Sequence, residues 1–155
     1  MGKHTHKTDR APRPDSSAAP PTGPVTTSRP TILVADHDPT VRALLQATLY
    51  RTGFAVCLAA DGPEAIDVYQ RDRFAITLVL LDLHLEGGGG LEILAELKKL
   101  NSRVRCCFTA SNLGDVLMQE LLASGALRVF MKPFPLAEVA QELRLLAGAE
   151  TACEV

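Results

Sequence analysis

Short apolar runs alternate with longer segments of helical periodicity from Thr31 almost to the end of the chain. Short runs of branched apolar residues are typical of strands buried on both faces, whereas apolar residues three or four apart indicate a helix with one buried side. The pattern predicts strands at 31–35, 54–59, 76–81, 104–108 and 127–131. It predicts helices from about 39 to 52, at 62–71, 91–100 and 114–123, and over a last segment that contains Leu136, Val139, Leu143 and Leu146.

Local signals support these boundaries. Pro39 suits the first turn of a helix, Asp38 before it can cap that helix, and Gly53 can end it. Five strands that alternate with five helices over roughly 120 residues predict an α/β fold. We therefore expect a doubly wound, five-stranded parallel sheet with helices on both sides.

Residues 1–30 differ in composition from the rest of the chain. They hold six of the ten prolines, many small or polar residues and almost no large apolar side chain. Such a segment buries too little surface to offset the entropy cost of ordering it, so we expect a disordered, Pro-rich, basic tail. It lacks the apolar stretch of a signal peptide. A flexible tether, a partner-binding arm and a wrongly assigned start codon all fit it.

Charge, hydropathy and cysteine spacing argue against a nucleic-acid-binding surface, a membrane span and a cysteine metal site. Residues 1–30 carry five basic and two acidic residues, whereas residues 31–155 carry 11 basic and 16 acidic ones. An acidic folded part argues against a nucleic-acid-binding surface, and no apolar stretch reaches the roughly 18 residues of a membrane span. The four cysteines lack the spacing of a metal site, so we expect buried reduced thiols in a cytoplasmic protein.

Four of the predicted strands end at a polar residue. These residues are Asp36, Asp82, Thr109 and Lys132. In doubly wound sheets, sites lie beyond the carboxyl ends of the strands, at the switch point in strand order. Two acids, a hydroxyl and a lysine at that edge suit a phosphoryl group and a cation. The glycines at 87–90 would let backbone and substrate approach Asp82 closely.

Four motifs, in their order along the chain, resemble the receiver domain of two-component response regulators. They are Ile-Leu-Val-Ala-Asp-His-Asp-Pro at 32–39, Leu-Val-Leu-Leu-Asp-Leu-His-Leu at 78–85 with Gly90 after it, Phe-Thr-Ala at 108–110, and Lys-Pro-Phe at 132–134. The resemblance implies a flavodoxin-like sheet with strand order 2-1-3-4-5. It divides the chain into the tail at 1–30, a receiver domain at 31–148 and a short C-terminal tail at 149–155.

The resemblance also implies roles for the residues at the strand ends. Asp82 would accept a phosphoryl group from a phosphohistidine on a histidine kinase or phosphotransfer protein. Thr109 and Lys132 would bind the phosphoryl oxygens. Asp36, Asp82 and the backbone carbonyl of His84 would hold Mg²⁺, which bridges carboxylate and phosphoryl oxygens.

Two positions depart from the family pattern. The family usually has a pair of acids after the first strand, and the second of them is His37 here. Because magnesium prefers oxygen ligands to imidazole, either Asp38 serves as a substitute ligand or the site binds Mg²⁺ weakly and phosphorylates slowly. The switch aromatic expected three residues before Lys132 is Val129, which weakens the usual coupling to an output.

Two other functions fit parts of the same pattern. His37 and Val129 are compatible with a receiver-like binding module that is never phosphorylated. Residues 36–40 also fit the nucleophile motif of haloacid-dehalogenase-like phosphatases. The phosphatase reading finds no final acidic pair after Lys132 and leaves Asp82 unexplained. We therefore expect a protein that is not an enzyme, with autophosphatase activity at most.

Protein contact is the expected output. About seven residues follow the last predicted helix, so we expect a stand-alone receiver, monomeric or weakly dimeric, without a DNA-binding domain. A downstream protein would read its state at the face formed by the predicted helix at 114–123, the strand at 127–131 and the last helix.

Overall fold

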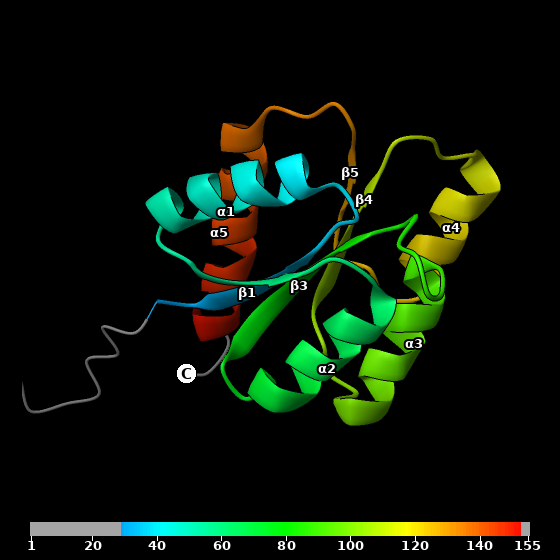
Figure 1. Cartoon of the computed structure of the whole chain (residues 1–155), viewed down its shortest axis with the longest axis horizontal. Helices are drawn as coiled ribbons and strands as arrows, with labels where there is room; N and C mark the ends of the chain where they lie inside the picture. Colours follow the sequence, from blue (N-terminus) through cyan, green and yellow to red (C-terminus); the bar gives the residue numbers. More distant parts are fainter. Residues whose placement is uncertain (1–28, 153–155) are drawn as a thin grey trace, which may run out of the picture.

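A computed structural model describes residues 29–152, which form one sheet flanked by helices (Figure 1). The strands are β1 (Thr31–Ala35), β2 (Ala55–Ala59), β3 (Ile76–Asp82), β4 (Cys106–Ala110) and β5 (Val129–Met131). The helices are α1 (Pro39–Thr52), α2 (Gly62–Asp72), α3 (Gly90–Leu100), α4 (Asp115–Ala123) and α5 (Leu136–Ala152). The predicted alternation of strands and helices is confirmed.

The strands form one parallel sheet in the predicted order, β2-β1-β3-β4-β5. The chain steps from β1 out to β2 and then returns past β1 to β3, so the strand order reverses between β1 and β3. The register places Ala35 beside Leu81 and Asp82 beside Thr109. The carboxyl ends of the three central strands therefore lie at one level, where ligands bind in folds of this kind.

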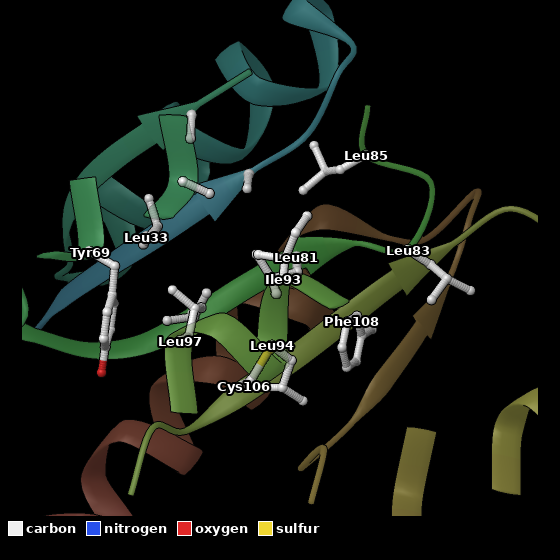
Figure 2. Close-up of a cluster of buried hydrophobic side chains, with 14 of the residues drawn as sticks. Leu33, Tyr69, Leu81, Leu83, Leu85, Ile93, Leu94, Leu97, Cys106 and Phe108 are labelled. Atoms are coloured by element: carbon white, nitrogen blue, oxygen red, sulfur yellow. The ribbon is translucent and has the colours of Figure 1, made fainter. Parts of the chain in front are cut away.

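Successive residues of the central strands enter two separate cores. Leu33 and Leu81 pack under α2, α3 and α4, whereas Ile32 and Leu80 pack under α1 and α5. Figure 1 shows α1 and α5 together on one side of the sheet and α2 and α3 on the other, and Figure 2 shows side chains of the first core. Because both faces are covered, β1 and β3 read as continuous apolar runs.

Four strands differ from their predicted ranges: β2 begins one residue later, β3 ends one residue later, and β4 and β5 differ by more. β4 begins at Cys106 rather than at 104, because the Val104 N–H closes a turn with the carbonyl three residues earlier. This strand continues through Thr109, which the sequence placed after the strand. β5 begins at Val129 instead of 127 and has three residues.

The folded part begins before the predicted limit. The Arg29 guanidinium lies 4.3 Å from the centroid of the Tyr50 ring and donates to the Tyr50 carbonyl at 2.7 Å. The Pro30 carbonyl accepts a hydrogen bond from the Ala55 N–H at 3.0 Å. The last two residues of the predicted tail therefore belong to the fold, and residues 1–28 lie outside the described part.

The last helix is longer than predicted. α5 reaches Ala152, because Gly148 lies within the helix rather than ending it. Residues 149–152, which the sequence assigned to a C-terminal tail, are thus helical. Residues 153–155 lie outside the described part.

Three cysteines can be placed. Cys57, Cys106 and Cys107 are free thiols. Cys106 and Cys107 are buried as predicted, whereas Cys57 on the edge strand β2 is only partly buried. Cys153 lies outside the described residues. Within residues 29–152, no helix is both long and apolar enough to cross a bilayer.

Candidate functional site

The polar residues predicted at the strand ends meet at the carboxyl edge of the sheet. They are Asp36 directly after β1, Asp82 at the end of β3, Thr109 near the end of β4 and Lys132 directly after β5. Backbone bonds hold the two outer positions: the Asp36 N–H donates to the Ala59 carbonyl at 3.1 Å, and the Lys132 N–H donates to the Ala110 carbonyl at 2.7 Å. The sheet itself thus fixes the spacing of the site.

Asp36 and Asp82 are almost completely buried, each with 1% of its surface exposed. Asp36 Oδ1 accepts the Asp38 N–H at 2.9 Å, and Asp82 Oδ1 accepts the His84 N–H at 3.1 Å. A buried carboxylate is costly unless hydrogen bonds and opposite charges compensate for lost hydration. One oxygen of each carboxylate is satisfied by backbone, so the other needs a cationic partner.

Lys132 supplies that partner for both acids. Its Nζ lies 2.7 Å from Asp36 Oδ2 and 3.5 Å from Asp82 Oδ2, and its side chain is 16% exposed. The lysine comes from the edge strand β5 and reaches across the end of the sheet to β1. Its head group therefore joins the two carboxylates that the sequence predicted would share a site.

His37 lies directly on Asp82. Its Nδ1 is 2.7 Å from Asp82 Oδ2 and 3.7 Å from Asp36 Oδ1, and its side chain is 53% exposed. Sequence reasoning treated His37 as the loss of an acid. The structure adds that the ring contacts the candidate phosphoacceptor and stands at the mouth of the pocket.

Asp38 caps a helix in this structure, whereas the sequence also allowed it to be a substitute Mg²⁺ ligand. Its Oδ1 accepts the N–H groups of Thr40 at 2.8 Å and Val41 at 3.4 Å, which caps the first turn of α1. A group of possible metal ligands is instead formed by Asp36, His37 and Asp82, whose donor atoms all lie within 4.8 Å of one another. In this arrangement Asp38 supports α1 and not the pocket.

Thr109 and His84 flank Asp82 in different ways. Thr109 is buried, with 1% of its surface exposed, and is the register partner of Asp82. The His84 side chain is exposed, and its backbone N–H is bound to Asp82. Both residues thus lie next to Asp82, and the roles that the sequence suggested for the Thr109 hydroxyl and the His84 carbonyl stay predictions.

Arg42 is a contributor that sequence reasoning missed. Its guanidinium, on the first turns of α1, donates to the backbone carbonyl of Asp36 at 2.7 Å. This bond ties the loop that carries Asp36 and His37 to the helix that follows it. A lone arginine on a helix has no pattern that would have revealed it.

The glycines after Asp82 shape the loop that leads into α3. Gly87 and Gly88 have φ angles of 80° and 121°, a left-handed conformation that other residues adopt at a cost. A Cβ at Gly90 would lie 2.8 Å from Phe108 Cε1 and 3.0 Å from Leu83 Cα. The glycines therefore let the loop turn and let α3 begin close to β4.

The donor set fits Mg²⁺ only in part. Asp36 and Asp82 offer the hard oxygen ligands that Mg²⁺ requires, but the third donor of the group is an imidazole. The chemistry that the pocket can perform with its own residues is nucleophilic attack by a buried carboxylate beside a lysine. Such an arrangement suits transfer of an anionic group.

Comparison with known families identifies the domain type. Residues 32–144 match the family described as "Response regulator receiver domain". The chain is 32% identical over 108 residues to sporulation initiation phosphotransferase F of Bacillus subtilis (strain 168), covering 70% of this chain and 86% of that protein. It is 34% identical over 119 residues to the DNA-binding response regulator MtrA of Mycolicibacterium smegmatis, covering 76% of this chain and 50% of that protein.

A solved structure agrees in fold. The receiver domain protein (CheY-like) from Methanospirillum hungatei JF-1 superposes with a TM-score of 0.73 at 22% identity, covering 81% of this chain and 98% of that one. The chain spans about half the length of MtrA and of most of the other curated relatives that it matches.

Proposed function

The chain belongs to the response regulator receiver family, and from that premise we propose that Asp82 accepts a phosphoryl group from a histidine kinase or phosphotransfer protein. The observation that carries the proposal is the burial of the Asp82 carboxylate at the end of the central strand, with Lys132 Nζ 3.5 Å away. A receiver is a signalling module, and in this proposal its phosphorylated state is the signal that other proteins recognise.

Each residue of the pocket has a part in the proposed transfer. A carboxylate oxygen of Asp82 attacks phosphorus, an O–P bond forms, and the N–P bond to the donor histidine breaks. Lys132 moves its ammonium group from Asp36 toward the phosphoryl oxygens, where negative charge has been added. The Thr109 hydroxyl, at the same level of the sheet, donates to one of them.

The proposed metal dependence follows from the donor set. A divalent cation, when bound, neutralises the carboxylates and the phosphoryl oxygens. Asp36, Asp82 and the His84 backbone carbonyl are the proposed oxygen ligands for Mg²⁺. We expect weak Mg²⁺ binding, because an imidazole stands where an acid usually does and Lys132 already pairs with Asp36.

A groove beside the pocket supports a protein as the phosphoryl donor. It has a volume of about 480 Å³ and is lined chiefly by apolar side chains and by Lys132. Its apolar lining includes Val41 and Leu44 of α1, Phe134 from the segment after β5, and Leu136 of α5. A donor protein seated on this groove would hold its phosphohistidine above Asp82. We place this exchange in the cytoplasm, between a monomeric or weakly dimeric receiver and its partners.

One contact favours a second function. Because His37 Nδ1 lies 2.7 Å from Asp82 Oδ2, the ring must move before a donor can reach that oxygen. A receiver-like binding module that is never phosphorylated would keep this contact permanently. Val129 in place of the switch aromatic favours the same alternative. The phosphatase alternative is weakened, since Asp38, which would be the general acid–base of the motif at 36–40, caps α1 with its carboxylate.

Acetyl phosphate tests these functions. The full-length protein is incubated with acetyl phosphate and Mg²⁺, and its intact mass is followed with time. We expect a gain of one phosphoryl group that is abolished in Asp82→Asn and retained in Asp67→Asn, a matched change on the exposed surface of α2.

The other outcomes are equally clear. Equal labelling of Asp82→Asn would show that another residue is the acceptor. An unlabelled wild-type protein would favour the binding module, and release of free phosphate that depends on Asp36 would favour the phosphatase.

A further inference from the structure

Two carboxylates and an imidazole converge on one point of the pocket. The donor atoms of Asp36, His37 and Asp82 all lie within 4.8 Å of one another. We propose that this site selects a divalent transition metal that accepts imidazole, of the class of Zn²⁺ or Ni²⁺, over Mg²⁺, with His37 as a ligand. The proposal rests on the proposed function for its purpose, because the ion would accompany the phosphoacceptor Asp82.

The chemistry of the donors decides between the two classes of ion. Mg²⁺ is a hard cation that demands oxygen ligands in near-ideal octahedral geometry. Zn²⁺ and Ni²⁺ accept carboxylate oxygens, and imidazole suits them far better than it suits Mg²⁺. A histidine at position 37 in place of an acid therefore removes a ligand for Mg²⁺ but supplies a ligand for Zn²⁺.

The distances allow the three donors to share an ion. His37 Nδ1 lies 2.7 Å from Asp82 Oδ2 and 3.7 Å from Asp36 Oδ1. Bonds of about 2.0–2.1 Å to one Zn²⁺ ion place neighbouring ligand atoms about 3.4 Å apart in a tetrahedron. Shifts of less than about one ångström at each side chain would therefore bring the donors to bonding positions. The half-exposed His37 ring leaves further positions open to water or to a phosphoryl oxygen.

The surroundings hold the carboxylates in place for such an ion. The Asp38 N–H binds Asp36 Oδ1, and the His84 N–H binds Asp82 Oδ1. Hydrogen bonds of this kind orient metal ligands. Lys132 is the competitor, because its Nζ already lies 2.7 Å from Asp36 Oδ2. An incoming ion would move the lysine aside, toward the place where a phosphoryl group would lie.

The test measures binding without any phosphoryl donor. Zn²⁺ and Mg²⁺ are titrated separately into the full-length protein by calorimetry, in a background that carries His4→Ala and His6→Ala so that histidines of the N-terminal segment do not contribute. The His37 ring resonances are followed by NMR in the same titration. We expect one Zn²⁺ per chain, a Zn²⁺ affinity well above that for Mg²⁺, and a Zn²⁺-dependent shift of the His37 ring signals.

Two variants separate His37 from its neighbours. His37→Asp restores the acid pair and should weaken Zn²⁺ binding at least about tenfold while it strengthens Mg²⁺ binding. Asp67→Asn removes an exposed carboxylate of α2, outside the site, and should leave both affinities unchanged. Equal Zn²⁺ binding by His37→Asp, or its loss in Asp67→Asn, would overturn the proposal.

Failure of this proposal and failure of the proposed function look different. If Zn²⁺ binding does not depend on His37 but acetyl phosphate labels Asp82, only the choice of metal is wrong. If Zn²⁺ binds through His37 but Asp82 is never labelled, the metal site stands and the phosphoacceptor role falls.

Discussion

Lys132 is held between two buried acids, Asp36 and Asp82, and is itself only 16% exposed. Removing it would leave both carboxylates buried at close range with less opposing charge. We expect Lys132→Ala to lower the free energy of unfolding by roughly 1–3 kcal/mol, the range for an unsatisfied buried polar group. Urea unfolding measures the change.

Lys99→Ala is the matched control for that substitution. Lys99 Nζ lies 2.7 Å from Glu96 Oε1, but both side chains are half or more exposed. Exposed pairs of this kind contribute at most about 1 kcal/mol. If the two variants unfold at the same urea concentration, Lys132 does not stabilise the buried acids.

The site residues were predictable to different degrees. Asp36, Asp82, Thr109 and Lys132 could be found because each follows or ends an apolar run, and parallel strands deliver their ends to one edge. The contact between His37 and Asp82 could not, since it depends on a side-chain rotamer that no periodicity reports. Sequence spacing alone also could not tell whether Asp38 would cap the helix or face the pocket.

At the scale of elements, the cap of α1 can be separated from the chemistry beside it. Asp38→Ala should lower the free energy of unfolding by about 1 kcal/mol, because it removes the acceptor for the Thr40 and Val41 N–H groups. Metal binding should stay unchanged. Thermal unfolding and a metal titration on the same variant check both parts.

Asp61→Ala provides the comparison. Asp61 caps α2 by accepting the Glu64 N–H at 2.8 Å, so its loss should cost a similar amount. A fall in metal affinity that occurs in Asp38→Ala but not in Asp61→Ala would make Asp38 a ligand after all.

The start of α3 gives a second prediction at this scale. Gly90→Ala would place a Cβ 2.8 Å from Phe108 Cε1 and 3.0 Å from the Leu83 backbone, so α3 must shift away from β4. Overpacking of this kind costs about 1–3 kcal/mol. Gly89→Ala, whose Cβ would meet nothing within 4 Å, should be tolerated. Equal midpoints in chemical unfolding would mean that the loop yields freely.

The ends of helices and strands were predicted well where a particular residue terminates the element, and poorly where no residue does so. Gly53 ends α1 at a φ of 108°, and its N–H returns to the Leu49 carbonyl, as a helix-ending glycine does. Gly148 keeps helical geometry, so α5 continues beyond it. The first residue of β4 could not be predicted either. Val104 is a β-branched residue of the kind found in strands, but its N–H forms the hydrogen bond of a turn.

At the scale of the molecule, burial sets a pH dependence. Burial raises the pKa of the Cys107 thiol to about 12, and it raises the pKa of Cys106 well above its ordinary value near 9. Above about pH 9 the unfolded chain releases thiol protons that the folded chain retains. The unfolded state then binds fewer protons, so stability must fall as pH rises from about 9 toward about 12.

Urea unfolding at a series of pH values above 9 checks this expectation. Cys107→Ala should flatten the decline, although its cavity lowers stability at every pH. An unchanged slope in that variant would show that other groups cause the alkaline loss.

The strand order was predictable from the resemblance to receiver domains, whereas the succession of elements alone predicted only a parallel sheet with helices on both sides. Which helix covers which face followed from the fold. The place of Arg29 and Pro30 did not, because their contacts with Tyr50 and Ala55 are made by residues far along the chain. A composition-based boundary cannot detect such contacts.

Cys106 and Cys107 are neighbours in sequence, yet one belongs to the core beneath α2, α3 and α4 and the other to the core beneath α1 and α5. The two adjacent thiols therefore report on opposite sides of the sheet. Each can react with an alkylating reagent only when the core on its own side opens. Pulsed alkylation followed by peptide fragmentation would show whether the two cores open at the same rate or at different rates. The same measurement after treatment with acetyl phosphate would show whether the phosphorylation proposed for Asp82 exposes one cysteine before the other.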